Sequence, residues 1–419
     1  MNVIIEKSTL KGKISAISSK SHAHRALICA SLSDNESVIR CDNISKDIQA
    51  TVNCLNDLGA DITYLNNNFY VKPIDVSKSK DKIDCGESGS TLRFLLPIIC
   101  ALGLKVSIKT HGRLSQRPLY PLDRELNKNG CVIQVNDDII SVSGKLKASE
   151  FLIEGNVSSQ FISGLLFALP LIDGKSKIFI KEKFESYSYV LLTLDVLKKY
   201  GITYKFENNS FELINSKYNS CDCVIEGDWS NAAFWLCAGA MLNDGLTVEN
   251  LAINSVQGDK KIIDILSCFG AKIETNGNSV HISKSKFKGI VVDASDIPDL
   301  VPIICVLACC VDGNTTITNA QRLRLKESDR IKSVVNMISS FGGIAQETED
   351  GLIISGCKLK GGVVNSYNDH RIAMSAAIAS IICEKNIEII DAESVEKSYP
   401  MFYNDFKKLN GKVKEKSDE

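Results

Sequence analysis

The sequence predicts an α/β protein built from six copies of one repeat, and three observations support this prediction. The chain has 419 residues, of which 44% are hydrophobic, and this is enough for two or three well-packed domains. Glycines recur 69 to 72 residues apart, each just after an amphipathic helical pattern. A second, more apolar helical pattern recurs every 69 to 71 residues. We therefore expect six units of about 70 residues, arranged as two domains of three units.

The first recurring element is an amphipathic helix that ends at a glycine and leads into a β-branched strand. Glycine suits this place because the residue just past a helix end often needs a positive φ. After five of the glycines, polar turn residues between alternating apolar residues predict a β-hairpin. The sixth copy lacks this turn, so we expect residues 3–14 to complete it and both termini to share one domain. The six segments are 48–62, 121–133, 191–204, 260–273, 331–344 and 403–413, with Gly59, Gly130, Gly201, Gly270, Gly342 and Gly411.

The second recurring element is a helix that is apolar on all sides, as is typical of a buried helix. Each unit should therefore have one inner helix, one outer helix and about four strands. A solenoid is the alternative, but its repeats are usually about 20 to 50 residues long, shorter than these. The expected domains are residues 19–227 and a discontinuous domain of residues 1–18 and 228–419. The inner helices begin near Ser21, Ser90, Ser159, Ser230, Asp299 and His370.

Composition excludes several classes of protein. The 49 Lys and Arg residues balance the 50 Asp and Glu residues, which argues against a nucleic-acid-binding protein. The 15 cysteines form no CxxC pair and many, such as Cys100, Cys237, Cys305, Cys309 and Cys310, lie in apolar runs, so we expect small buried thiols in a reducing cytoplasm. The N-terminus soon meets a charge, and the longest uncharged run, 155–172, contains a proline and polar residues. We therefore expect neither a signal peptide nor a membrane span.

Charged residues gather where the inner helices begin. Helix capping explains the Ser, Asp and Gly residues there. It does not explain Gln160, nor the cations Lys20, Arg25, Arg93 and Arg371, because a cation in the first turn opposes the helix dipole. A bound phosphate or carboxylate would compensate for these cations. Because equivalent elements of a repeat should point the same way, we expect a polyanionic small substrate in a cleft between the domains.

Basic motifs also precede three of the outer helices. They contain Arg117, the pair Glu327 and Arg330, and Lys397. Taken alone, Glu327 and Arg330 would be an exposed i,i+3 pair worth only a few tenths of a kcal/mol. Their recurrence in the matching place of three copies favours a functional role instead.

Several motifs follow one another along the chain: Ser19-Lys20-Ser21 with Arg25, Gly89 with Arg93, Arg117-Pro118, Ser158-Ser159-Gln160, Pro298-Asp299, Lys326-Glu327-Ser328-Asp329-Arg330 and Asn368-Asp369-His370-Arg371. In this order, the motifs resemble those of the 5-enolpyruvylshikimate-3-phosphate (EPSP) synthase family, and the resemblance spans nearly the whole chain. It implies a two-domain inside-out α/β barrel of six βαβαββ units. It also implies transfer of the carboxyvinyl group of phosphoenolpyruvate to the 5-hydroxyl of shikimate 3-phosphate, with release of phosphate, on the way to chorismate and the aromatic amino acids.

The resemblance also assigns residues to the two substrates. The reaction needs a general base and a general acid, for which we expect Asp299 and Glu327. Lys20 is the third expected catalytic residue, bridging the substrates and helping to move protons. We expect a monomer that needs no metal and no organic cofactor. Shikimate 3-phosphate should contact Lys20, Ser21, Arg25, Ser158, Ser159, Gln160, Ser186, Tyr189, Asp299 and Lys326. Phosphoenolpyruvate should contact Lys20, Gly89, Arg93, Arg117, Gln160, Arg330, Arg371 and Lys397.

The chain departs from the family pattern in places. Residues 186–189 read Ser-Tyr-Ser-Tyr where the family often has Ser-Lys-Pro-Tyr or Ser-Arg-Pro-Tyr, so a basic residue is missing. Glu87-Ser88 replaces a common Asn-Ala. Gly89 is the small residue associated in the family with sensitivity to the inhibitor glyphosate. Among the histidines, we expect His22 and His24 to be surface residues at a helix start.

Two other functions compete with this interpretation. The sister enzyme UDP-N-acetylglucosamine enolpyruvyl transferase shares the fold but usually carries a reactive cysteine in the loop that matches residues 112–118, and this loop has none. A non-catalytic anion-binding protein is the second alternative. Asp299 and Glu327 argue against it, because carboxylates repel an anionic ligand.

Overall fold

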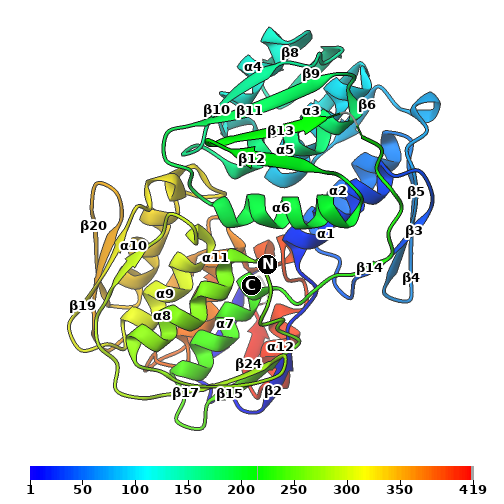
Figure 1. The fold of residues 1–419 in the computed structure, drawn as a ribbon. Coiled ribbons are helices and arrows are strands. Elements are labelled where there is room, and N and C mark those ends of the chain that lie inside the picture. Colours follow the sequence, from blue (N-terminus) through cyan, green and yellow to red (C-terminus); the bar gives the residue numbers. More distant parts are fainter. Residues whose placement is uncertain (215, 417–419) are drawn as a thin grey trace. The chain divides into compact units, whose positions relative to one another are not determined.

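The computed structural model describes residues 1–214 and 216–416. The chain divides into two compact units, one formed by Met1–Ser19 with Glu226–Glu419 and the other by Lys20–Ile225. Within the described residues, each unit holds three four-stranded sheets and three pairs of helices (Figure 1). The predicted six-repeat α/β architecture is thereby confirmed.

In the unit Lys20–Ile225, three inner helices and three outer helices alternate along the chain. The inner helices are α1 (Lys20–Ser31), α3 (Gly89–Leu102) and α5 (Ser159–Ala168), and the outer helices are α2 (Lys46–Asp57), α4 (Leu122–Lys128) and α6 (Tyr187–Lys199). The first sheet has the order β14 (Cys223–Val224), β3 (Ser37–Arg40), β5 (Asn68–Lys72), β4 (Asp61–Leu65). The second has the order β6 (Lys82–Asp84), β7 (Val106–Lys109), β9 (Ile139–Gly144), β8 (Cys131–Asn136). The third has the order β10 (Glu150–Glu154), β11 (Lys175–Lys181), β13 (Ser210–Ile214), β12 (Tyr204–Glu207).

The other unit repeats this plan. Its inner helices are α7 (Trp229–Ala240), α9 (Val301–Ala308) and α11 (His370–Ala379), and its outer helices are α8 (Ile262–Phe269), α10 (Arg330–Ser340) and α12 (Phe402–Lys408). Its first sheet has the order β16 (Lys272–Asn276), β17 (Ser279–Ser283), β15 (Leu246–Glu249), β2 (Lys13–Ser15). The second has the order β18 (Val291–Asp293), β19 (Asn314–Thr318), β21 (Leu352–Ser355), β20 (Ile344–Glu347). The third has the order β22 (Val363–Asn365), β23 (Ile387–Ile390), β1 (Val3–Glu6), β24 (Lys412–Glu415).

The predicted hairpins form with the expected turn chemistry. Asn66 and Asn67 both have positive φ, 52° and 61°, in the two-residue turn between β4 and β5. Two consecutive positive φ values define a type I′ turn, whose twist matches that of the strands, and asparagine tolerates this conformation. Asn208 and Asn209 make the same turn between β12 and β13.

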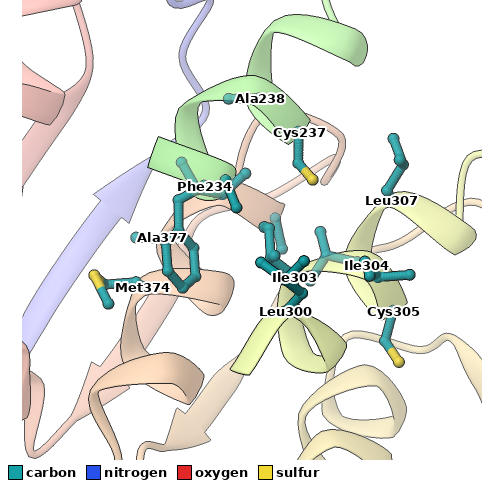
Figure 2. Close-up of a cluster of buried hydrophobic side chains, with 14 of the residues drawn as sticks. Phe234, Cys237, Ala238, Leu300, Ile303, Ile304, Cys305, Leu307, Met374 and Ala377 are labelled. Carbon is teal, nitrogen blue, oxygen red and sulfur yellow. The ribbon is translucent and has the colours of Figure 1, made fainter. Parts of the chain in front are cut away.

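The inner helices are buried because they are apolar on every side. All eight residues of α9 are buried, and α9 packs against α7 and α11. Figure 2 shows Phe234 and Cys237 of α7, Ile303 and Ile304 of α9 and Met374 of α11 gathered in this core. Burying each large apolar side chain contributes about 1.5 to 3 kcal/mol. The packing of these apolar helices therefore holds their polar first turns in place.

The N-terminal segment contributes to two sheets rather than one. β1 pairs antiparallel with β24, with Ile5 opposite Val413, and so completes the sixth copy as expected. β2, which contains Ile14, pairs instead in parallel with β15, with Ile14 opposite Val248. In four copies the strand before the inner helix pairs with the strand after it, for example β18 with β19. In the first and fourth copies these strands are exchanged, because β14 pairs with β3 and β2 pairs with β15.

Cys100, Cys237, Cys305 and Cys309 are buried as small apolar side chains, as predicted, whereas Cys310 is half-buried. Within residues 1–214 and 216–416, no helix is both long enough and apolar enough to cross a membrane.

Candidate functional site

The predicted site residues fall into two sets, one in each unit. The unit that contains both termini carries Asp299, Lys326, Glu327, Arg330, Arg371 and Lys397. The unit Lys20–Ile225 carries Lys20, Ser21, Arg25, Gly89, Arg93, Arg117, Ser158, Ser159, Gln160, Ser186 and Tyr189.

Arg330, the first residue of α10, is the centre of the first set. Its side chain is 1% exposed. Nη1 donates to Asp299 Oδ1 at 2.7 Å, Nη2 donates to Glu327 Oε2 at 2.7 Å, and Nε donates to Asp369 Oδ2 at 2.8 Å. Burial alone would lower the pKa of this guanidinium, but the carboxylates of Asp369, Glu327 and Asp299 hold it well above its ordinary value. The proposed base and the proposed acid therefore share one permanently charged partner.

Asp369 joins the starts of two helices. It caps α11 by accepting a hydrogen bond from the backbone N–H of Arg371 at 2.9 Å, and it accepts another from Ser328 Oγ at 3.0 Å. Its side chain is fully buried. Because Asp369 also binds Arg330, the first turns of α10 and α11 are held in a fixed relation.

Asp299 lies in the short 3-10 helix η5 (Pro298–Leu300), just before α9, and three cations surround it. Besides the bond to Arg330, its carboxylate lies 3.4 Å from Arg371 Nη2 and 3.7 Å from Lys326 Nζ. Burial would raise the pKa of Asp299, but Lys326, Arg330 and Arg371 together hold it well below its ordinary value. Asp299 is therefore ionised near neutral pH and can accept a proton.

Of the other cations of this set, Arg371 and Lys397 are buried and Lys326 is half-buried. Burial lowers the pKa of Lys326 to about 8, although Asp299 opposes this change. Arg371 is 2% exposed, donates to the Ser230 carbonyl oxygen at 3.0 Å and to Ser230 Oγ at 2.6 Å, and lies over the ring of Phe234. Lys397 donates to the Asn368 carbonyl oxygen at 2.7 Å. Arg371 and Lys397 are thus fixed by hydrogen bonds, and Lys326 is held by its ion pair with Asp299.

In the other unit, a second group surrounds Arg93 in the first turn of α3. Arg93 Nη1 donates to Gln160 Oε1 at 2.8 Å, and Gln160 Nε2 donates to Ser90 Oγ at 3.0 Å. A methyl group built on Gly89 would lie 2.8 Å from Arg117 Nη1 and 3.1 Å from Arg93 Nη1. The absence of a side chain at Gly89 thus lets two guanidinium groups approach the start of α3.

A third group surrounds Arg25 in α1. Its side chain is 2% exposed and donates to Thr193 Oγ1 at 2.8 Å, to the Ser21 carbonyl oxygen at 2.7 Å and to the Tyr189 carbonyl oxygen at 3.0 Å. Burial lowers its pKa to about 10, so the side chain stays charged at neutral pH. Nearby in the chain, Lys20 Nζ donates to Asp47 Oδ2 at 2.7 Å.

Serines form the starts of two further helices in this unit. Ser158 caps α5 by accepting a hydrogen bond from the backbone N–H of Gln160 at 3.3 Å, and Ser159 is the first residue of that helix. Ser186 precedes α6 with a φ of +53°, an uncommon conformation for a residue with a side chain. Ser158 and Ser186 therefore each stand directly before a helix of this unit.

The sequence and the fold both match a known family. A family model described as EPSP synthase (3-phosphoshikimate 1-carboxyvinyltransferase) matches residues 4–406. The chain belongs to the EPSP synthase family. Relatives named 3-phosphoshikimate 1-carboxyvinyltransferase from Clostridium novyi strain NT and Clostridium acetobutylicum are 44% and 45% identical, and each match covers 99% of this chain and 98% or 99% of the relative. A solved structure of EPSP synthase from Acinetobacter baumannii matches with a TM-score of 0.82 at 25% identity, over 99% of this chain and 100% of that chain.

One departure from the EPSP synthase pattern now has a structural account. Tyr187, which stands where the family often has a basic residue, packs among aromatic rings. Its ring centroid lies 4.7 Å from that of Phe184 and 6.1 Å from that of Phe206. Tyr187 thus stabilises the packing between α6 and β12 and supplies no charge to the segment.

The expectation that His22 and His24 lie at the surface is wrong. They are 3% and 1% exposed, because α1 is enclosed on all sides. Burial lowers the pKa of His22 to about 3 and that of His24 well below its ordinary value, and His24 Nδ1 lies 2.7 Å from Thr51 Oγ1. Both are neutral core residues.

Sequence reasoning missed several partners of the site residues. Asp47, Thr193 and Ser230 hold Lys20, Arg25 and Arg371. Asp259 has a buried carboxyl group beside Ser230 and Arg371. Ser230 and Asp259 had a usable signal, because Ser230 begins an inner helix and Asp259 precedes an outer helix in the same place as the basic motifs. Across the described part of the chain, no group of three or more His, Cys, Asp or Glu side chains is arranged to hold a metal ion.

Proposed function

We propose that this chain transfers the enolpyruvyl group of phosphoenolpyruvate to the 5-hydroxyl of shikimate 3-phosphate and releases phosphate. The single observation that carries the proposal is the pair of carboxylates, Asp299 and Glu327, each 2.7 Å from the buried guanidinium of Arg330. A site that only binds anions gains nothing from carboxylates, whereas a reaction that moves two protons needs them. Membership of the EPSP synthase family supports the same reaction.

The cations suit the two substrates, each of which carries a phosphate and a carboxylate. Arginine binds such groups with two parallel hydrogen bonds, and lysine binds them as a point charge. We assign Lys20 and Gln160 to both substrates. Shikimate 3-phosphate is assigned to Ser21, Arg25, Ser158, Ser159, Ser186, Tyr189, Asp299 and Lys326. Phosphoenolpyruvate is assigned to Gly89, Arg93, Arg117, Arg330, Arg371 and Lys397.

The chemistry proceeds by addition and then elimination. Asp299 takes the proton of the 5-hydroxyl while that oxygen forms a bond to C2 of phosphoenolpyruvate, and Glu327 protonates C3 to give a methyl group. In the elimination, the bond between C2 and the phosphate oxygen breaks, a methyl proton returns to Glu327, and the phosphate leaves with the proton held by Asp299. Substrate anions that bind Arg330 and Arg371 draw these cations away from Asp299, which increases its proton affinity.

The assigned residues come from both units, so the proposal requires that both contribute to one active site. We further propose that shikimate 3-phosphate draws the units together and excludes water from the reaction. Small-angle X-ray scattering should show a smaller radius of gyration at saturating shikimate 3-phosphate, and an unchanged radius would contradict this step. A monomer in the cytoplasm is part of the same proposal.

The deciding experiment measures phosphate release from phosphoenolpyruvate with purified protein. Release that depends on shikimate 3-phosphate is the expected result. Release only with UDP-N-acetylglucosamine would assign the chain to the sister reaction, which the lack of a cysteine in residues 112–118 disfavours. No release with either acceptor, from protein shown to be folded by circular dichroism, would favour an anion-binding protein without catalysis.

A further inference from the structure

Asp259 has a buried carboxyl group, and none of the substrate-binding and proton-transfer roles proposed above involves it. It lies in the short 3-10 helix η4 (Gly258–Lys261), which packs against the inner helix α7. Its side chain is 3% exposed. A carboxyl group withdrawn from water in this way needs hydrogen-bond partners that compensate for its lost hydration.

Ser230 connects Asp259 to Arg371. The Ser230 hydroxyl lies at the start of α7 and makes a side-chain hydrogen bond with Asp259. The same hydroxyl oxygen accepts a 2.6 Å hydrogen bond from Arg371 Nη2. Because a guanidinium can only donate, the hydroxyl oxygen is the acceptor in that bond, and its own hydrogen is directed to the Asp259 carboxylate. The result is a chain of donors that runs from Arg371 through Ser230 to Asp259.

The charges around Asp259 make these hydrogen bonds sensitive to the protonation of Asp259. Burial, together with the carboxylates of Asp299 and Asp228, raises the pKa of Asp259 to about 6, although Ser230 and Arg371 act to lower it. Arg371 Nη2 also lies 3.4 Å from Asp299 Oδ2. Arg371 is therefore held between two carboxyl groups. It contacts that of Asp299 directly and that of Asp259 through Ser230.

We infer that Asp259 is a positioning residue that, through Ser230, holds the guanidinium of Arg371 in the orientation that receives the anionic groups of phosphoenolpyruvate. This inference rests on the proposed function, which assigns Arg371 to that substrate. Without the Asp259 carboxylate, the Ser230 hydroxyl can rotate, and Arg371 loses a fixed acceptor. The guanidinium then turns more fully toward Asp299, so that binding the substrate first requires breaking a tighter ion pair.

The test is Asp259→Asn, which keeps the shape of the side chain and removes its charge. We expect the KM for phosphoenolpyruvate to rise about tenfold, as is typical when a hydrogen bond to a charged group is lost. The KM for shikimate 3-phosphate should change less than about twofold and kcat less than about threefold, because Asp259 touches neither reacting atom. Ser230→Ala should raise the KM for phosphoenolpyruvate by the same factor. The double variant should raise this KM no more than Ser230→Ala alone, because both changes break the same series of hydrogen bonds.

A matched control and a pH profile separate positioning from general destabilisation. Asp405 is an equally buried carboxylate in the same unit, bonded to Tyr399 and Lys408, and Asp405→Asn should leave both KM values unchanged. Asp259→Asn should fold, because a buried carboxyl with a raised pKa is already penalised in its charged form. The ratio of kcat/KM between the wild type and Asp259→Asn should fall as the pH is lowered through about 6, where Asp259 becomes protonated. The titration of the substrate phosphate affects the wild type and the variant equally, so it cancels in this ratio.

The outcomes distinguish this inference from the proposed function. If the wild type turns over and Asp259→Asn keeps the wild-type KM for phosphoenolpyruvate, or if the effects of the two single variants add, the positioning role is wrong. If the wild type shows no turnover, the proposed function fails, and nitrogen-15 NMR of the arginine side chains decides the inference alone. Faster rotation of the Arg371 guanidinium in Asp259→Asn than in the wild type, with the signal identified by Arg371→Lys, supports it, and equal rotation overturns it.

Discussion

Asp299 and Glu327 are bonded to different terminal nitrogens of one guanidinium, that of Arg330, at 2.7 Å each. The two groups proposed for opposite proton transfers are thus held at a fixed separation by one buried cation. Any substrate anion that binds Arg330 must compete with both carboxylates, so substrate binding and the basicity of the site are linked.

Replacing Asp299 tests its role as the base. We expect Asp299→Ala to lower kcat by about 10²- to 10⁴-fold, the usual contribution of a positioned acid or base. Phosphate release and circular dichroism measure the turnover and the fold. Glu347→Gln is the control, because this carboxylate pairs with Arg324 at 2.7 Å in an accessible position and should keep wild-type turnover. Unchanged turnover in folded Asp299→Ala would show that the base is another group.

Replacing Arg330 tests the energetic weight of the buried network. Arg330→Met leaves the fully buried Asp369 without its cation, and we expect a loss of about 3 to 5 kcal/mol in the free energy of unfolding. Urea denaturation measures this change. Arg324→Met removes a partly exposed pair and should cost about 1 kcal/mol or less. Equal losses in the two variants would mean that the buried network adds no stability beyond that of a surface pair.

Lys326 should set the alkaline limit of activity. Burial lowers its pKa to about 8, so the ammonium is charged below this pH and loses its charge as the pH rises through it. We expect kcat/KM for shikimate 3-phosphate to fall above about pH 8, because this parameter reports the free enzyme. Lys326→Arg should abolish this fall, since arginine stays protonated at such pH values. The same alkaline fall in Lys326→Arg would assign it to another group.

Gly89→Ala tests the approach of two arginines to the start of α3. The added methyl group would lie 2.8 Å from Arg117 Nη1 and 3.1 Å from Arg93 Nη1. Both are the ends of flexible side chains, so we expect the protein to fold, the KM for phosphoenolpyruvate to rise about tenfold and inhibition by glyphosate to weaken. Kinetics at varied phosphoenolpyruvate measure both effects. Wild-type inhibition at micromolar glyphosate is expected, and its absence at millimolar concentration would show that the site does not take this inhibitor.

The sequence by itself determined the repeat and the helices, because these depend on local rules. An apolar helix such as α9 is buried wherever it packs, and paired asparagines such as Asn66 and Asn67 form a type I′ turn without distant help. The tertiary structure alone decided which groups meet. Arg330 contacts Asp299 and Asp369, which lie 31 and 39 residues away, and Asp259 reaches Arg371 only through Ser230.

The same reasoning explains the two expectations that the structure changed. His22 and His24 are polar residues in a short helix, and nothing local tells whether other elements enclose that helix on every side. Likewise, no sequence feature of β2 and β14 identifies the strands with which they pair. Strand pairing depends on which sheet edge is free once the helices have packed. Burial and pairing are properties of the assembled chain, and a single segment carries no information about its distant neighbours.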